Sequence, residues 1–168
     1  MDINQIYKKL CHIPSDINEH LPTLKQYASE CRVIVELGMR DGVSTWALLA
    51  GKPKEMVSID IIFPKVDIDL YKITRAEGIE YYFWLGSSLE VKIPCDLLFV
   101  DTIHTYDQLS KELKLWGNHV EKYIILHDTT SCKEELEPAV NEFLEQNKQW
   151  SIDEVFENNN GLTILKHG

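Results

Sequence analysis

Cysteine is scarce in this sequence, and its four cysteines stand far apart with no C-x-x-C pair among them: Cys11, Cys31, Cys95 and Cys132. This spacing disfavours a structural zinc site and a disulfide framework, so we expect reduced thiols in a cytoplasmic protein. Long apolar runs are also missing, since no stretch approaches the roughly 18 residues that span a bilayer. Residues 1–10 lack the continuous apolar segment of a signal peptide.

Positively charged residues are also few relative to negatively charged ones. Lys and Arg number 17 against 27 Asp and Glu, which gives a formal net charge of −10 at pH 7. Such an acidic chain repels phosphate backbones and anionic lipids, and it has no Lys/Arg-rich run to form a basic patch. We therefore expect neither nucleic acid nor a membrane as a partner. Phosphate-binding motifs are absent too, since the sequence contains neither G-x-G-x-x-G nor a P-loop with its lysine.

The length of 168 residues suits one domain, because the chain has no internal repeat, low-complexity tract or Pro/Ser-rich linker. A hydrophobic fraction of 44% is ordinary for a globular domain of this size. Apolar residues recur at helical spacing within 2–10 and 18–30, ahead of the first strand-like run. We expect a single domain over residues 1–168, in which residues 1–30 form an N-terminal helical cap.

Strand-like and helix-like segments alternate through the rest of the chain, which predicts an α/β domain with a mostly parallel sheet. The strand-like runs are 32–38, 56–60, 80–85, 96–101 and 122–126, followed by a hairpin of 151–156 and 162–165. Helices are predicted at 43–50 and about 67–77. An apolar stripe from Tyr106 to Val120 predicts a third helix, and a Ser131–Glu134 capping box predicts the start of a fourth.

A glycine loop joins the first strand to the next helix, and its residues indicate a ligand site. Gly38 and Gly42 let the backbone approach a ligand that a Cβ would block. Glu36 and Asp41 make the segment acidic, which favours a ligand with a cationic end over a pyrophosphate. Asp60 ends the second strand, where a carboxylate can accept both hydroxyls of a ribose. The alternative is a plain strand–turn–helix in which Asp60 only forms a turn.

Five strands with crossover helices and a terminal hairpin resemble the class I S-adenosylmethionine (SAM) methyltransferase fold, over about residues 30–168. The resemblance implies a Rossmann-like doubly wound sheet of seven strands, with the last strand antiparallel beside the fifth. Segment 36–45 resembles methyltransferase motif I, E-x-G-x-x-x-G-x-S, and segment 86–88 resembles the loop that contacts the adenine. The implied cofactor is SAM, bound by Glu36, Gly38, Met39, Arg40, Gly42, Ser44, Asp60, Ser87, Ser88 and Asp101.

Acidic and imidazole side chains follow the fourth and fifth strands, which are neighbours in this topology. Asp101, His104, His127 and Asp128 should therefore cluster at one edge of the sheet. Converging carboxylates and imidazoles indicate either a metal site or general-base machinery. Carboxylates and water suit Mg²⁺, whereas a set rich in histidine suits a softer metal.

The pattern V-D-x-x-H-x-Y followed by H-D-T is similar to a subset of small-molecule O-methyltransferases. These are related to the macrolide-sugar methyltransferases and to the cephalosporin-hydroxylase-like group. The resemblance implies His104 as the catalytic base beside Asp101, and Asp101, His127 and Asp128 as ligands of Mg²⁺. His127 stands where metal-binding relatives often have Asp or Glu, so the alternative is that both histidines only orient loops.

Several functions stay open beside the O-methylation of a sugar or phenolic acceptor. One is another SAM-site or hydroxylase-like enzyme on the same fold, and another is a non-catalytic SAM-binding accessory domain. The G-x-x-x-G spacing disfavours an NAD-linked dehydrogenase. Insertions between the late strands are short, so the site is either open or completed by a partner subunit in a homo-oligomer. The remaining histidines read as surface or helix residues: His12, His20, His119 and His167.

Overall fold

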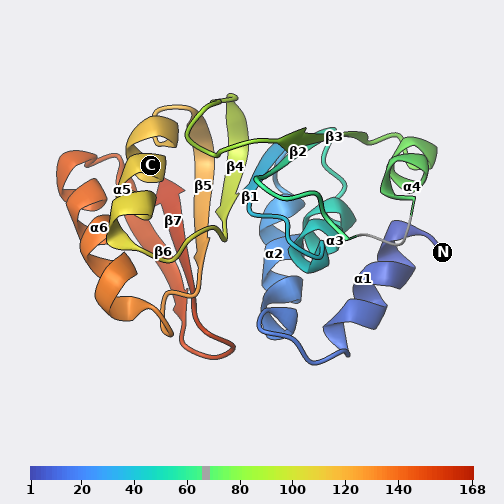
Figure 1. The fold of residues 1–168 in the computed structure, drawn as a ribbon, viewed down its shortest axis with the longest axis horizontal. Coiled ribbons are helices and arrows are strands. Elements are labelled where there is room, and N and C mark those ends of the chain that lie inside the picture. Colours follow the sequence, from blue (N-terminus) through green and yellow to red (C-terminus); the bar gives the residue numbers. More distant parts are fainter. Residues whose placement is uncertain (66–68) are drawn as a thin grey trace.

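The computed structural model describes residues 1–65 and 69–168, which form three layers with a sheet in the middle (Figure 1). Seven strands lie in the order β3-β2-β1-β4-β5-β7-β6. They are β1 (Val33–Leu37), β2 (Glu55–Asp60), β3 (Glu80–Leu85), β4 (Cys95–Val100), β5 (Val120–His127), β6 (Trp150–Phe156) and β7 (Leu162–His167). Strands β1 to β5 are parallel, whereas β7 runs antiparallel between β5 and β6. The expected Rossmann-like sheet is confirmed.

Helices cover both faces of this sheet. One face carries α1 (Ile3–Cys11), a 3₁₀ turn (Asn18–His20), α2 (Leu21–Ala28), α3 (Val43–Ala50) and α4 (Leu70–Ala76). The other face carries α5 (Tyr106–Trp116) and α6 (Lys133–Gln146). Successive strand residues point to opposite faces, as Ile34 and Val35 do in β1, so two separate apolar cores form. Strands covered on both faces explain the continuous apolar runs of the sequence.

Several predicted helices differ from the structure at their ends. The segment 18–30 begins with the 3₁₀ turn before α2, and the predicted helix of 67–77 falls partly on residues outside the described ranges. The stripe through Val120 predicted too long a helix, because α5 ends at Trp116 and Val120 is the first residue of β5. Gly117 is the C-cap of α5, and the turn after it leads the chain directly into the strand.

The predicted Ser131–Glu134 capping box is wrong. Helix α6 begins at Lys133, and its N-cap Cys132 makes no side-chain hydrogen bond to the helix. The Ser131 hydroxyl is used elsewhere, since its Oγ donates to Asp128 Oδ1 at 2.8 Å. A serine that can serve either a helix end or a nearby loop here serves the loop.

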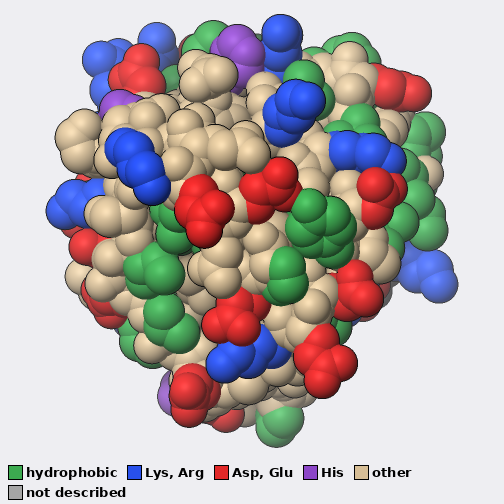
Figure 2. All heavy atoms as spheres, turned by 90° about the vertical axis from the view of Figure 1, so that its left-hand side faces the viewer, with side chains coloured by type: hydrophobic (Ala, Val, Ile, Leu, Met, Phe, Trp, Pro, Cys, Tyr) green, Lys and Arg blue, Asp and Glu red, His purple; other side chains and the backbone are tan. Residues whose placement is uncertain are grey.

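The face formed by α6 and β6 is rich in acidic side chains (Figure 2). The exposed glutamates of α6 are Glu134, Glu135, Glu137, Glu142 and Glu145. Basic side chains are intermixed with acidic and apolar ones over this face (Figure 2). Such a surface gives no continuous attraction for phosphate groups. Within the described ranges, we find no helix with the length and apolar character needed to cross a membrane.

Candidate active site

The glycine loop lies at the carboxyl end of β1 and needs its glycines for backbone reasons. Gly38 has φ +87°, and a Cβ placed on it would lie 2.0 Å from the carbonyl oxygen of Asp101. Gly42 has φ +77° and is the N-cap residue of α3. Only glycine adopts such angles without strain or clash. The loop therefore packs directly against the residue that follows β4.

Asp60 ends β2, as predicted, and holds the same loop in place. Its Oδ2 accepts hydrogen bonds from the backbone N–H groups of Met39 and Arg40, each at 2.9 Å. Its Oδ1 accepts one further bond, from the N–H of Ile62 at 2.9 Å. A carboxylate has about four acceptor positions, so a lone pair on Oδ1 is left for a ligand hydroxyl.

Glu36 lies beneath the loop and points into the protein. The sequence analysis had instead predicted that its charge faces a ligand. Its side chain is fully buried and accepts hydrogen bonds from the hydroxyls of Ser44, Thr45 and Ser58 at 2.6–2.8 Å. Burial raises the pKa of Glu36 to about 7, although these three hydrogen bonds act in the opposite direction. Glu36 and Ser44 thus form an internal support that ties β1, β2 and α3 together.

Met39 and Arg40 lie in the loop on opposite sides. Met39 is buried, and its sulfur accepts a hydrogen bond from the Tyr81 hydroxyl at 3.4 Å. Arg40 is exposed, with φ +48°, and its guanidinium pairs with both carboxylate oxygens of Asp16 at 2.7–2.8 Å. This ion pair joins the N-terminal segment to the glycine loop, at a surface position where such pairs contribute about 1 kcal/mol or less.

Ser87 and Ser88 follow β3 but face different ways. Ser87 Oγ accepts from the N–H of Leu89 in a local turn. Ser88 is buried and donates to Glu112 Oε1 at 2.6 Å. The Ser88 hydroxyl is therefore engaged with the protein interior.

Glu112 of α5 is a buried residue beside the candidate site that the sequence analysis did not predict. It is fully buried and accepts hydrogen bonds from Ser88, from Thr102 Oγ1 and from Gln108 Nε2. Burial raises its pKa, against the effect of these three donors. Glu112 thereby links the loop after β3 to the loop after β4. The sequence did carry one signal of its burial, since Glu112 lies between Leu109 and Leu113 of the apolar helix stripe.

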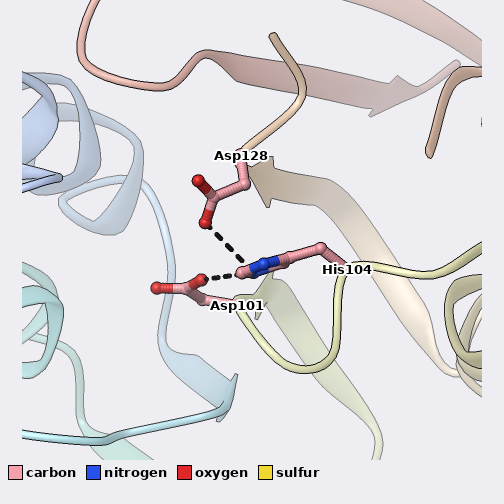
Figure 3. Close-up of side chains that lie close together, drawn as sticks. All are labelled: Asp101, His104 and Asp128. Carbon is pink, nitrogen blue, oxygen red and sulfur yellow. Dashed lines mark hydrogen bonds and ion pairs between the residues drawn. The ribbon is translucent and has the colours of Figure 1, made fainter. Parts of the chain in front are cut away.

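The predicted cluster forms at the carboxyl ends of β4 and β5. His104 Nε2 lies 3.1 Å from Asp101 Oδ1 and 3.0 Å from Asp128 Oδ2, so both carboxylates point at one ring nitrogen (Figure 3). His127 Nδ1 lies 3.5 Å and 3.1 Å from the same two oxygens. Asp128 has φ +59°, an angle that aspartate tolerates better than most residues. One ligand atom each from Asp101, His104 and Asp128 lie within 4.8 Å of one another.

Charge is balanced inside this cluster. Burial raises the pKa of Asp101, but hydrogen bonds and charge from His104 and His127 outweigh burial and hold the pKa below its ordinary value. The same competition lowers the pKa of Asp128. Hydrogen bonding to Asp101 raises the pKa of His104. Burial lowers the pKa of His127, but the two carboxylates outweigh it and raise the value to about 10. Two histidines thus face two carboxylates, which raise the pKa of both imidazoles.

The turn between β6 and β7 contacts the cluster from the other side. His127 Nε2 lies 3.3 Å from the carbonyl oxygen of Asn159. His20 shares this environment: its Nε2 lies 2.9 Å from the carbonyl oxygen of Asn158, and its ring meets that of His127 edge-on at 5.9 Å. His20 is 1% exposed and ends the 3₁₀ turn, so of the two interpretations given above it is a helix residue and not a surface residue. Burial lowers its pKa.

Comparison with known proteins identifies the architecture. No family model matches the sequence, and a search of curated proteins gives no match either. Solved structures do match. A methyltransferase from Podospora anserina with bound SAH superposes with a TM-score of 0.69 and 14% identity, covering 99% of this chain and 87% of that one. The chain has the fold of the class I SAM-dependent methyltransferases.

Two further structures agree with this assignment. An O-methyltransferase from Bacillus cereus in complex with SAH has a TM-score of 0.64 and 15% identity, over 99% of this chain and 89% of that one. The N-methyltransferase NodS from Bradyrhizobium japonicum, in complex with S-adenosyl-L-homocysteine (SAH), has a TM-score of 0.65 and 12% identity, over 99% of both chains. Because O- and N-methyltransferases share this fold, the acceptor atom has to be argued from the site.

Proposed function

We propose that this protein is a SAM-dependent methyltransferase that methylates a hydroxyl group of a sugar, a phenol or another small molecule. The contact between Gly38 and the Asp101 carbonyl carries the proposal, because it joins the glycine loop to the carboxylate–histidine cluster. A ligand bound along the loop has its far end beside Asp101 and His104. The SAH-bound structures of the same fold support the choice of cofactor.

The residues around the loop suit a cofactor that is cationic at one end and carries a ribose. The backbone of Gly38, Met39, Arg40 and Gly42 would line it, and Asp60 Oδ1 would accept a ribose hydroxyl. Ser87 would face the adenine. Glu36, Ser44 and Ser88 would act indirectly, because their polar atoms are engaged inside the protein. Asp101 would attract the positive charge of the methionine part.

We assign to His104 the role of general base. SAM supplies an electrophilic methyl group on a sulfonium. His104 Nε2 is held by Asp101 and Asp128, which leaves the other ring nitrogen, Nδ1, to accept the proton of the acceptor hydroxyl. The acceptor oxygen, which gives its proton to His104, would be the nucleophile toward that methyl group. As in other carboxylate–histidine pairs, the carboxylates orient the ring and stabilise its protonated form.

Mg²⁺, which the resemblance implies, stays a prediction. Asp101, His127 and Asp128 are the residues that would hold it. Mg²⁺ prefers oxygen ligands and keeps several waters. Two of the four groups that converge here are imidazoles, which Mg²⁺ rarely accepts, so the donor set fits this ion poorly. Every step above is therefore assigned to the side chains themselves.

The N-terminal segment is proposed as a cap of a single domain over residues 1–168. The Arg40–Asp16 ion pair and the packing of α1 and α2 against α3 support this proposal. We propose that this cap, or a partner subunit of a homo-oligomer, encloses the acceptor. A cytoplasmic location, with neither nucleic acid nor a membrane as partner, also stays a prediction.

Calorimetric titration with SAM and with NAD tests the cofactor, and transfer of labelled methyl from SAM to a panel of phenols and sugars tests the reaction. His104→Ala is expected to lose methyl transfer and to keep nearly the SAM affinity of the wild type. His12→Ala, which removes an exposed histidine outside the site, is the matched control and should change neither. A folded wild-type protein that binds no SAM would refute the proposal.

Loss of SAM binding in His104→Ala would move that residue from catalysis into the cofactor pocket. A wild-type protein that binds SAM but methylates nothing in the panel would favour the non-catalytic accessory domain.

A further inference from the structure

Strand β3 forms one edge of the sheet and pairs only with β2. The backbone N–H groups of Glu80 and Gly86 donate toward β2. Alternate residues of a strand direct their backbone groups to opposite sides, so those of Tyr81, Phe83 and Leu85 point away from the sheet. Within the described ranges, the N–H groups of these three residues have no hydrogen-bond partner. The edge can therefore accept a further strand.

The two edges of the sheet differ in how they are protected from such pairing. Exposed edges usually carry lysine, proline or a bulge that prevents the addition of a strand. Strand β3 has neither Lys nor Pro, and its register with β2 is continuous. The opposite edge, β6, has a register irregularity between Ile152 and Glu154 and exposes the charged residues Asp153 and Glu154. Only the edge of β3 is thus suited to a partner.

Exposed apolar side chains surround this edge. Tyr82 and Trp84 lie on the face of the sheet that α5 and α6 cover elsewhere, and they stay exposed because the crossover from β3 to β4 forms no helix over them. On the other face, the rings of Phe63 and Tyr71 lie 5.6 and 5.5 Å from those of Phe83 and Tyr81. We call the exposed set the β3 patch: Phe63, Tyr71, Tyr82, Trp84 and Leu85.

The size of the β3 patch matches what a stable interface needs. Its five side chains are 48–71% exposed. For side chains of this size, such exposure amounts to roughly 600–700 Å² of accessible surface. Each partner of a stable protein interface contributes about 800 Å², and the backbone of the strand edge adds to the side-chain area.

We infer that a second copy of this chain pairs its own β3 with this edge, so that two sheets join into one across a dimer interface. A two-fold axis makes the two strands antiparallel. Outward-pointing residues must face one another, which is satisfied when Phe83 lies on the axis and Tyr81 faces the partner's Leu85. Tyr82 then lies opposite the partner's Trp84, and aromatic pairs across two strands are favourable.

This dimer does not depend on the proposed enzymatic function. Two strands, β2 and β1, separate β3 from the cluster of Asp101, His104 and Asp128 at the ends of β4 and β5. The partner copy therefore does not enclose the acceptor, and the dimer can be measured without SAM.

Sedimentation velocity of the full-length protein over a range of concentrations tests the inference. We expect the wild type to sediment as a dimer that dissociates only on dilution to micromolar concentrations or below. Hydrogen exchange at the Phe83 amide should slow as the protein concentration rises, because that N–H becomes hydrogen-bonded in the dimer.

Tyr82→Lys and Trp84→Glu alter half-exposed side chains, so the fold is retained, and each should raise the dissociation constant of the dimer at least about tenfold. The double variant places opposite charges at facing positions of the two copies and should bind more tightly than either single variant. Val155→Lys, which alters an exposed residue of the opposite edge, is the matched control and should leave the dimer unchanged.

A wild-type protein that stays monomeric at all concentrations would overturn the inference and leave this edge to a different partner. A dimer that both single variants leave intact, or that Val155→Lys disrupts, would overturn it as well. A double variant that binds more weakly than both single variants would contradict the antiparallel register.

Discussion

Glu36 offers the sharpest test of how the glycine loop is supported, because its charge can be removed while its shape is kept. The side chain is fully buried and is surrounded by the hydroxyls of Ser44, Thr45 and Ser58. Glu36→Gln preserves the shape, and hydroxyl groups can accept as well as donate, so the amide keeps partners. The variant therefore isolates the cost of ionising a carboxyl group at this position.

The magnitude follows from the pKa of Glu36, which burial raises from 4.5 to about 7. A carboxyl group whose pKa is higher in the folded state contributes stability that is complete below its unfolded pKa and is lost as the pH rises through its folded pKa. At roughly 1.36 kcal/mol per pH unit, the loss between pH 4.5 and pH 8 is on the order of 3 kcal/mol. Glu36→Gln cannot ionise and escapes this loss.

Urea unfolding followed by tryptophan fluorescence, at several pH values from 4.5 to 8, measures the difference. The free energy of unfolding of Glu36→Gln minus that of the wild type should rise by on the order of 3 kcal/mol over this range. Glu80→Gln, which alters an exposed glutamate of β3, is the control and should show a flat difference. A difference for Glu36→Gln that stays constant within about 0.5 kcal/mol would refute the reasoning.

Substitutions at two further positions, Gly38 and Glu112, test the contacts that hold the site together, and urea unfolding measures each. Gly38→Ala should lower the free energy of unfolding by at least about 2 kcal/mol, because its Cβ would meet the Asp101 carbonyl oxygen at 2.0 Å and its φ is +87°. A loss below about 0.5 kcal/mol would contradict that account of the loop. Glu112→Ala leaves the buried hydroxyl of Ser88 without its acceptor and should cost about 2–3 kcal/mol. Glu112→Gln should recover much of that loss, and equal losses in both variants would contradict the proposed link.

The fold could be read from the sequence where one signal dominated. The strand-like run of 32–38 is apolar because β1 is covered on both faces, and its pattern admits few other interpretations. Val120 was assigned to the helix although it belongs to β5. An apolar residue at that position is typical both of the apolar stripe of a helix and of the start of a buried strand. The backbone turn after Gly117, which separates the two elements, leaves little trace in the pattern.

The candidate site was predictable as a location and much less so in its contacts. Because β4 and β5 are parallel neighbours, their carboxyl ends meet at one edge, so the sequence predicted that Asp101 and Asp128 lie together there. The direction of Ser88 depends on Glu112, a partner 24 residues away, and a local pattern does not encode such a pair. His20 is buried because the turn of β6 and β7 covers it, a contact across 138 residues.

The turn between β6 and β7 has a consequence for the order in which the molecule gains its structure. Its Asn159 accepts from the N–H of Glu19, 140 residues earlier, and lies against His127. The carbonyl of Asn160 accepts from Thr130 and Ser131, beside the cluster. Contacts between such distant parts of a chain form late in folding, since long loops must close first. During synthesis the parallel strands can pair before the turn leaves the ribosome, so the cluster reaches its final geometry only when the hairpin closes behind it.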